Sequence, residues 1–312
     1  MVYKIIAVAV FIRRFKIFDK SERVLIHAHF LSTGLEVAIL LKSIYTETTI
    51  VGTAHGSDVL FQSKSKVSKL VSEADLIFAA SHAVAERIYQ ANEFKCFDSQ
   101  SKVIVRYCRV PVNDEIGFEQ KRRFTEPLLR ILTVARFHPQ KGLDIALKTA
   151  KLLKDMDIAF YWKIIGDGQM RSKLEHLILD FGLESHVSLL GAKPREDVQI
   201  AMRESDIMVL PSVRTSNSSD GLPVVILEAM SSGLYVVTTN VGGITEAIAE
   251  NRGSIVEADP YLLSNEILRV WRRGASNIVQ TNAARNWIEL NCLRGDSDPL
   301  AVAYTALRGN SL

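Results

Sequence analysis

Two kinds of hydrophobic pattern alternate along most of the chain. Short apolar runs, such as TTIVGTAH at 48–55, are followed by longer stretches in which apolar residues recur with helical spacing. The short runs predict buried strands and the longer stretches predict amphipathic helices, so their alternation indicates parallel βαβ units. The expected fold class is α/β, with doubly wound, Rossmann-like sheets that bind ligands at the carboxyl ends of their strands.

The apolar runs give the expected strand positions. In the first half of the chain we expect strands at 48–55, 75–81 and 101–107. In the second half we expect them at 129–136, 160–166, 187–191, 206–212, 235–240 and 254–258. Each run of the second half is followed by a helix or a turn, which predicts a complete doubly wound sheet there.

The 312 residues are enough for two cores of roughly 100–200 residues each. Segment 110–127 has two prolines, mixed charge and weak periodicity, so we place a linker at 116–127. This gives an N-terminal domain at 1–115 and a C-terminal domain at 128–290. We expect the last segment, 291–312, to pack back on the N-terminal domain.

Charge is divided unevenly between the two halves. Residues 1–125 hold 18 Lys and Arg against 13 Asp and Glu, a net charge of +5, and the remainder holds 20 against 22, a net charge of −2. A basic first half suits an anionic acceptor or anionic lipid headgroups, although a solvated surface explains it as well. The chain lacks interleaved basic and aromatic blocks, so we expect no nucleic-acid partner.

The N-terminal run at 1–12 is too short for a membrane span, which needs about 20 apolar residues. Basic residues follow this run instead of preceding it, which argues against a signal peptide. We interpret it as a buried or interfacial helix, with peripheral contact to the inner membrane as the alternative. Cys96, Cys108 and Cys292 are widely spaced, which fits a reducing, cytoplasmic location without disulfides or a zinc site.

The first candidate site residues follow the strand expected at 129–136. Arg136 ends this strand, and Lys141 and Gly142 open the next helix. Two cations and a helix N-terminus at one strand end attract an anion. The alternative is that both side chains are ordinary solvated surface charges.

Glycines follow the strand expected at 160–166. Gly166 and Gly168 form a Gly-x-Gly turn that brings backbone close to a ligand. The third glycine of a dinucleotide fingerprint would fall at Arg171 and is absent, so a nicotinamide-dependent oxidoreductase is poorly supported. A tight turn with ordinary packing remains the alternative.

The strand expected at 206–212 leads into a polar loop and then a helix. Gly221, Leu222 and Pro223 open this helix, and the free N–H groups near Gly221 and Leu222 suit a phosphate. Asp220 precedes the helix and Glu228 lies about two turns inside it, so the two carboxylates bind different hydroxyls. A phosphate flanked by acids that bind diols describes a nucleotide sugar. The alternative is that Asp220 caps the helix and Glu228 pairs with a lysine.

Taken together, these motifs resemble the donor-binding domain of the retaining GT-B glycosyltransferases of family 4 (glycosyl transferases group 1), especially the exopolysaccharide, colanic acid type branch. The resemblance covers residues 128–260 and rests on VARFHPQKGLD, IIGDGQMRSKLE, LLGAKPREDV, DIMVLPS and DGLPVVILEAMSSGLYVVTTNVGGITEAI. LIHAHF at 25–30 and TAHGSDV at 53–59 extend it into the first half.

The resemblance implies roles for the candidate residues of the second half. Arg136 and Lys141 hold the donor diphosphate and neutralise the leaving group. Glu228 binds the nucleotide ribose. Asp220 stands where the family motif normally begins with Glu, so its reach toward the transferred sugar is one methylene shorter.

The resemblance also implies that His55 lies beside the transferred sugar and the attacked carbon, with Asp58 nearby. It implies front-face attack with retention of configuration. The matched motifs contain neither a protein nucleophile nor an Asp-x-Asp metal motif, so we expect neither a metal ion nor a cofactor. The expected function is transfer of a hexose from a UDP- or GDP-linked nucleotide sugar to a glycan or lipid-linked oligosaccharide acceptor in exopolysaccharide biosynthesis, at the cytoplasmic membrane face.

The sequence departs from the family pattern at its start. Family members place two further βα units before the segment that matches LIHAHF, whereas only 24 residues precede Leu25 here. Roughly 70–90 residues of a usual two-domain member are therefore expected to be missing. The alternative function is an inactive, truncated remnant that still binds a sugar nucleotide.

Overall fold

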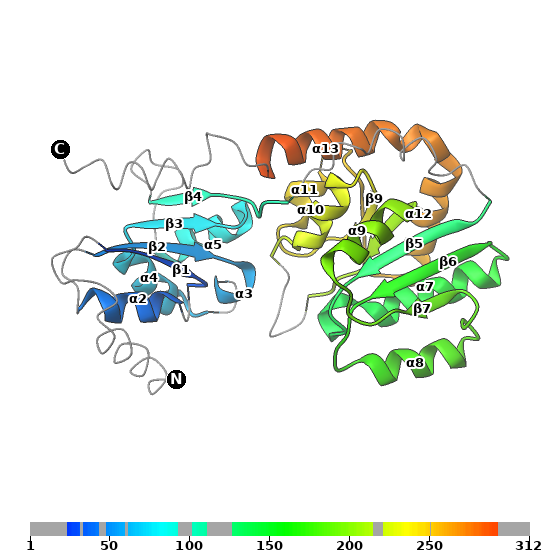
Figure 1. Cartoon of the computed structure of the whole chain (residues 1–312), viewed down its shortest axis with the longest axis horizontal. Coiled ribbons are helices and arrows are strands. Elements are labelled where there is room, and N and C mark those ends of the chain that lie inside the picture. Colours follow the sequence, from blue (N-terminus) through cyan, green and yellow to red (C-terminus); the bar gives the residue numbers. More distant parts are fainter. Residues whose placement is uncertain are drawn as a thin grey trace. The chain divides into compact units, whose positions relative to one another are not determined.

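The structure is a computed structural model of the chain, and it describes residues 24–31, 34–43, 48–59, 62–92, 102–110, 127–214, 221–249 and 251–292. The chain divides into two compact units, with the first boundary between Tyr107 and Cys108. We call the part before this boundary unit 1 and the part from Cys108 to Cys292 unit 2. Both are parallel α/β units (Figure 1).

Unit 1 is built on a parallel sheet with the strand order β1-β2-β3-β4. Its described elements are β1 (Val24–His29), α2 (Gly34–Lys42), β2 (Thr48–Ala54), α3 (Gly56–Val59), α4 (Lys64–Glu73), β3 (Leu76–Ala79), α5 (His82–Asn92) and β4 (Val103–Val105). The core of unit 1 forms where Ile50 and Ile77 on the sheet meet Leu35 and Ile88 on the helices. The predicted strands at 48–55, 75–81 and 101–107 are therefore present. The first is one residue shorter than expected, the second has four residues and the third has three.

Unit 2 is built on a second parallel sheet, with the order β10-β9-β8-β5-β6-β7. Its strands are β5 (Leu129–Val134), β6 (Phe160–Ile165), β7 (Val187–Leu189), β8 (Ile207–Leu210), β9 (Tyr235–Thr239) and β10 (Ser254–Val256). All six lie inside the predicted runs. The order reverses between β5 and β8, which makes this the switch point of a doubly wound sheet.

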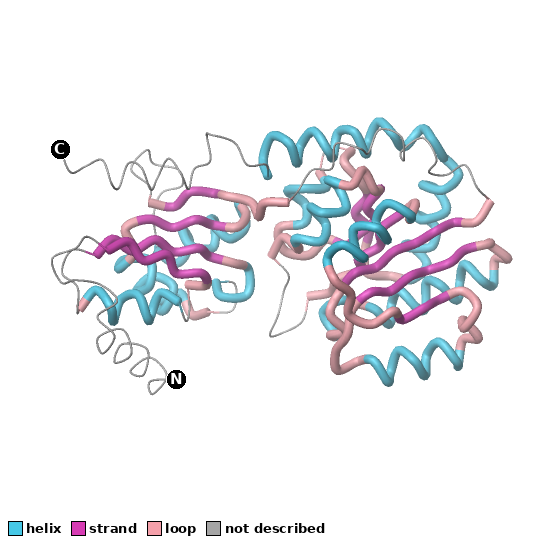
Figure 2. Tube along the Cα trace, viewed as in Figure 1, coloured by secondary structure: helices cyan, strands magenta, loops and turns pink. Residues whose placement is uncertain are grey.

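The helices of unit 2 cover its sheet in two groups (Figure 2). They are α7 (Leu143–Asp155), α8 (Arg171–Asp180), α9 (Arg195–Glu204), α10 (Val224–Ser231), α11 (Ile244–Ile248), α12 (Pro260–Arg273) and α13 (Ile278–Cys292), with short 3-10 turns η2 (Pro139–Lys141) and η3 (Gly274–Asn277). Helix α7 packs beside α8 and α12, while α13 packs on α10 and α11. Because parallel crossovers are right-handed, the two groups lie on opposite faces of the sheet.

A chain of buried polar contacts joins the three central strands of unit 2. The Trp162 indole N–H donates to Thr133 Oγ1 at 3.0 Å, and the Thr133 hydroxyl donates to the Val209 carbonyl at 2.6 Å. Asp206, which is 1% exposed, accepts the Arg130 backbone N–H at 2.8 Å and pairs with its guanidinium at 3.3 Å. A buried carboxylate left without these partners would be costly, so they fix the β5–β8 pairing.

Several expectations fall on other parts of the chain. The helix expected near residues 1–12 and the linker at 116–126 lie outside the described residues, as do residues 293–312 of the expected C-terminal segment. These stay predictions. Among the helices that the structure describes, none combines the length and apolar character that a bilayer span requires.

Candidate functional site

The loops that follow β5 and β8 are joined directly at the switch point. The Val213 N–H donates to the Gln140 carbonyl at 2.8 Å. Gly142 has φ of 60°, and a Cβ at this position would lie 1.9 Å from the Pro211 carbonyl oxygen. Only glycine fits such an approach. Backbone contacts therefore hold the two loops that carry most of the predicted site in one arrangement.

The loop after β6 is held against the loop after β5 in the same way. Gly166 has φ of 141°, and a Cβ there would lie 1.8 Å from the Ala135 carbonyl oxygen. The Phe137 N–H donates to the Asp167 carbonyl at 2.8 Å. Close packing of two loops thus accounts for Gly166, as the alternative interpretation held. A contact of Gly166 or Gly168 with a ligand stays a prediction.

The turn after β9 joins the segment that opens α10. The Gly243 N–H donates to the Gly221 carbonyl at 3.0 Å, and the Thr239 hydroxyl donates to the Ser212 carbonyl. The loops after β5, β6, β8 and β9 therefore form one connected set at the carboxyl edge of the sheet. We call this set the loop cradle.

Arg136 and Lys141 both lie in the loop cradle, between β5 and α7. Arg136 is exposed, and its side chain has no ion-pair partner within the part of unit 2 that the structure describes. Lys141 is half-buried and ends the 3-10 turn η2. We expected Lys141 and Gly142 to open the helix directly. Instead Gly142 is the N-cap and α7 begins at Leu143, because the left-handed backbone of Gly142 separates the two turns.

Helix α10 begins at Val224, three residues after Gly221, the first residue expected to open it, so Glu228 lies little more than one turn inside the helix and not two. Pro223 is its N-cap and not part of its first turn, with ψ of 125°, and no side chain caps the helix at this position. The first N–H groups of α10 lack intrahelical acceptors, as in any helix, and therefore can bind an anion. Gly221 and Leu222 precede them, whereas Asp220 lies outside the described residues, so its role stays a prediction.

Glu228 lies inside α10, where its side chain is 22% exposed. Its carboxylate pairs with Arg195 at 3.2 Å, so the predicted lysine partner is in fact an arginine. Burial raises the pKa of Glu228, and the Arg195 charge offsets only part of this effect. A half-buried carboxylate with one exposed partner is suited to bind a diol in place of that partner.

Sequence reasoning missed Arg195, although a signal was present. Arg195 is the first residue of α9, where the helix dipole disfavours a positive charge. The acidic residues that usually occupy a first turn follow it, at Glu196 and Asp197. A cation at an unfavourable helix position indicates that something else stabilises it, which here is Glu228.

His55 lies in unit 1, directly after β2, and is half-buried. Burial and the nearby His29 lower its pKa, so its imidazole is neutral near pH 7 and can accept a proton. Asp58 lies in α3, and its predicted role next to the sugar stays a prediction.

Two more histidines, which were not among the predicted site residues, lie on the adjacent strand. The rings of His27 and His29 stack at 4.4 Å, and His27 Nε2 lies 2.7 Å from Thr53 Oγ1. Burial, together with His29 and Arg106, lowers the pKa of His27 to about 4. The carboxyl ends of β1 and β2 therefore bring His27, His29 and His55 together, because the two strands are paired in parallel up to His29 opposite Thr53.

The sequence contains two Asp-x-Asp patterns, Asp155–Asp157 and Asp296–Asp298. Asp155 pairs with Lys151 at 2.7 Å. It lies at the end of α7, and therefore at the edge of the sheet opposite the loop cradle. The second pattern lies outside the described residues. No group of three metal-ligating side chains occurs among the residues that the structure describes. That the reaction needs neither metal nor cofactor stays a prediction.

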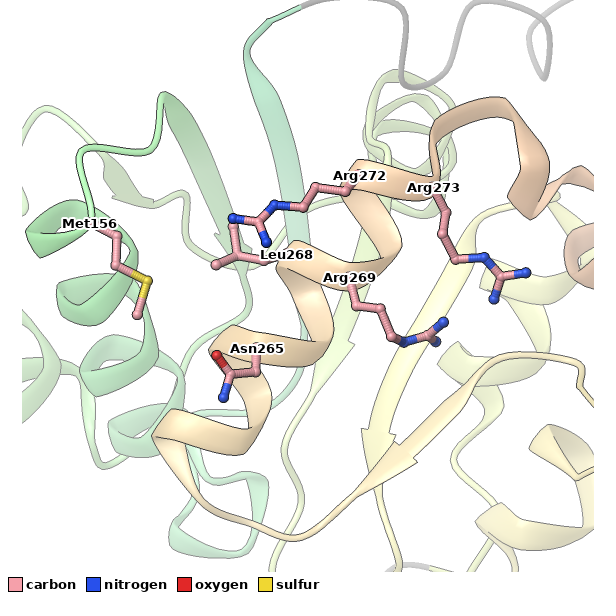
Figure 3. A pocket seen from close by; sticks show the side chains of 6 residues that line it. All are labelled: Met156, Asn265, Leu268, Arg269, Arg272 and Arg273. Atoms are coloured by element: carbon pink, nitrogen blue, oxygen red, sulfur yellow. The ribbon is translucent and has the colours of Figure 1, made fainter.

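A cavity of about 570 Å³ lies elsewhere in unit 2. Figure 3 shows the side chains that line it, Met156, Asn265, Leu268, Arg269, Arg272 and Arg273, around α12. Met156 follows the end of α7, which runs back from the loop cradle, so the cavity lies toward the opposite edge of the sheet. Arg269 there is already neutralised by Glu266 at 2.5 Å.

Two α/β units with parallel sheets, of which unit 2 is doubly wound, are found in GT-B glycosyltransferases, and solved structures show this fold. A glycosyltransferase from Rickettsia africae has a TM-score of 0.73 at 18% identity, over 98% of this chain and 81% of its own. Anabaena HepE in complex with UDP and glucose has a TM-score of 0.71 at 19% identity, over 99% and 81%.

The family profile "Glycosyl transferases group 1" matches residues 115–287, more than half of the chain. The chain therefore belongs to this family. The amylovoran biosynthesis glycosyltransferase AmsK of Erwinia amylovora is 37% identical over 164 residues, 52% of this chain and 40% of the relative. The putative colanic acid biosynthesis glycosyltransferase WcaL of Escherichia coli is 35% identical over 142 residues, 45% and 35%. The chain thus spans less than half the length of these curated relatives.

Proposed function

We propose that the chain is a retaining glycosyltransferase of the family 4 type, which transfers a hexose from a nucleotide sugar to a lipid-linked glycan precursor of an exopolysaccharide. The observation that carries the proposal is the loop cradle, which combines the cations Arg136 and Lys141 with two helix N-termini lacking side-chain caps, those of α7 and α10. The names of the relatives AmsK and WcaL support exopolysaccharide synthesis. A solved neighbour in complex with UDP-glucose supports a UDP-linked donor.

In the proposed reaction the loop cradle stabilises the charge that develops on the departing diphosphate. Arg136, Lys141 and the first N–H groups of α10 are positioned on rigid loops, so they need little reorganisation when the glycosidic bond breaks. The bond between the anomeric carbon and the diphosphate oxygen breaks while the acceptor oxygen bonds to the same face. The acceptor proton passes to the leaving diphosphate, so no protein nucleophile is needed.

The remaining candidate residues bind the substrates in this proposal. Glu228 accepts hydrogen bonds from the ribose hydroxyls and releases Arg195 when it does so. Asp220 binds hydroxyls of the transferred hexose, and the neutral His55 accepts a hydrogen bond from it, with Asp58 nearby. We place the enzyme at the cytoplasmic face of the inner membrane, as a peripheral protein.

The test is the melting temperature of the full chain with and without UDP, GDP, UDP-glucose and GDP-mannose. A ligand at 100 times its Kd stabilises the folded state by about 2.7 kcal/mol. We expect one nucleotide series to raise the melting temperature, and Lys141→Ala to weaken its binding about tenfold or more because a charged hydrogen bond to phosphate is lost. Lys148→Ala, an exposed lysine on the same helix α7, is the matched control.

The transfer step has its own measurement. Radiolabelled sugar should move from the bound donor to the lipid fraction of bacterial membranes, and Glu228→Ala should abolish this transfer. If neither nucleotide series stabilises the wild-type chain, the proposal fails. If a nucleotide binds but neither transfer nor donor hydrolysis occurs, the chain is the non-catalytic sugar-nucleotide-binding remnant.

A further inference from the structure

Phe30, the residue directly after β1, has a backbone conformation that a bulky side chain rarely adopts. Its φ is 71°, in the left-handed region. Among the described residues, the other non-glycine positions with positive φ are Asp157 and Asn251, whose short polar side chains tolerate this region. The Phe30 side chain is also 50% exposed, so burial in a core does not explain its presence.

Hydrogen bonds on both sides of Phe30 hold it in this conformation. Its N–H donates to the Thr53 carbonyl at 3.1 Å, and its carbonyl accepts from the Gly34 N–H at 3.0 Å. A Cβ at Gly34 would lie 2.5 Å from the His29 carbonyl oxygen, so the turn from β1 into α2 is tight. Strain that neighbouring elements maintain at an exposed residue indicates a functional position.

The strained turn places the Phe30 ring against His55. The two ring centroids are 4.7 Å apart and the planes are inclined by 41°. Phe30 follows β1 and His55 follows β2, so both are at the carboxyl edge of the sheet of unit 1. We call these two side chains the Phe30–His55 platform. It offers an exposed apolar ring beside an imidazole that is neutral near pH 7.

We propose that the Phe30–His55 platform binds a pyranose ring, the apolar C–H face packing on Phe30 and a hydroxyl bonding to His55. This inference rests on the proposed glycosyltransferase function, and it names the substrate moiety bound by unit 1. An aromatic ring provides apolar contact at a low entropy cost, while a hydrogen bond to the imidazole fixes the orientation of the sugar. The pyranose comes either from the acceptor glycan or from the hexose of the donor.

The variant Phe30→Asn separates binding from folding. Asn suits a left-handed backbone, so the melting temperature should be unchanged or higher, whereas a structural role for the ring predicts a lower one. Phe30→Tyr keeps the aromatic face and should restore sugar binding. Tyr261→Asn removes another exposed aromatic residue, 59% exposed on α12, and is the matched control.

Saturation-transfer NMR with the full chain and the methyl glycosides of glucose, galactose and mannose measures binding of an acceptor-like sugar. UDP-glucose and UDP melting shifts, measured in parallel, report the donor. If the platform holds an acceptor, Phe30→Asn lowers the glycoside signal about fivefold and leaves both melting shifts intact. If it holds the donor hexose, the UDP-glucose shift falls to that of UDP.

The inference is overturned when Phe30→Asn changes neither readout, when Phe30→Tyr loses binding as fully as Phe30→Asn, or when Tyr261→Asn has the same effect. It also fails when the wild-type chain binds no glycoside and responds equally to UDP and UDP-glucose. A wild-type melting shift with UDP in that last case leaves the proposed nucleotide binding intact. Absence of any nucleotide response instead removes the proposed function itself.

Discussion

At the scale of single residues, unit 1 stands out for histidines that are held neutral. His27 lies between Thr53, His29, Phe78 and Arg106, and burial is the largest cause of its lowered pKa. His55 is affected in the same direction by burial and by His29. Protonation of these rings is therefore less favourable in the folded state than in the unfolded state.

This cost predicts that the stability of unit 1 falls in acid. Folded His27 has a pKa near 4 against 6.5 when unfolded, so its stabilising effect is complete above pH 6.5 and is lost as pH falls toward 4. After a reduction for solvent screening, we expect the free energy of unfolding to fall by an amount on the order of 1 kcal/mol. Urea unfolding of wild type and His27→Gln from pH 7 to 4 measures it, and the variant should show a shallower decline.

His82→Gln is the control for that titration. His82 also lies at the carboxyl edge of the sheet, as the first residue of α5, next to Tyr107 at 6.2 Å. The acid decline of His27→Gln is compared with that of His82→Gln, which separates the effect of His27 from that of a histidine-to-glutamine change elsewhere at this edge. If the free energy of unfolding falls equally steeply with pH in wild type and in His27→Gln, His27 is not the cause of the loss of stability in acid.

The Arg195–Glu228 pair gives a second test at this scale. If Glu228 must release Arg195 in order to bind ribose, Arg195→Ala removes a competitor and strengthens nucleotide binding, by up to about tenfold. Arg203→Ala, at the other end of α9, is the matched control. Calorimetric titration with UDP measures the change, and weaker binding to Arg195→Ala would show that Arg195 contacts the nucleotide or positions Glu228.

At the scale of elements, the loop cradle depends on backbone atoms at close approach. Gly142→Ala forces a Cβ against the Pro211 carbonyl and places a side chain at φ of 60°, so we expect a loss of more than about 2 kcal/mol in the free energy of unfolding. Gly191→Ala has a similar positive φ, 74°, but its new Cβ meets only the Arg171 guanidinium, 3.6 Å away, and should cost about 1–2 kcal/mol. Denaturant unfolding compares them, and equal losses would mean that the contact with Pro211 relaxes freely.

Much of the fold at this scale could be predicted from the sequence. Strands β5 to β10 lie within the predicted runs because each run is mainly apolar, and β8 and β9 are buried at every position, whereas the outermost strands β7 and β10 are only partly buried. The strand β1 was not predicted, since His27 and His29 interrupt the apolar pattern of VLIHAH. These histidines are tolerated in a strand because one stacks on the other and His27 also contacts Thr53.

The candidate site could be predicted less completely. Loops after strands are visible in sequence, and so are Arg136, Lys141 and Glu228. Contacts between distant segments are not, so neither the Arg195 partner nor the approach of Phe30 to His55 followed from the pattern. The Gly166 turn was ambiguous in sequence because close backbone packing and ligand contact both require glycine.

At the scale of the whole molecule, the two units have hydrophobic cores that share no residue. Ile77 belongs to the core of unit 1 and Ile131 to that of unit 2, and both are fully buried. Each Ile→Ala change should cost about 2–5 kcal/mol within its own unit. Calorimetry with and without UDP tests this, and only Ile131→Ala should lower the transition that the nucleotide raises. A shift of that transition by Ile77→Ala would show that the cores unfold together.

The joined loops of unit 2 have a consequence for how this protein can change. Backbone carbonyls and N–H groups set the spacing of these loops, so the loop arrangement does not depend on which side chains project from it. Substitutions at exposed positions such as Arg136 then alter chemistry without moving the scaffold. For the proposed transferase, donor preference in such a frame can be re-engineered one side chain at a time, provided that Gly142 and Gly166 are kept.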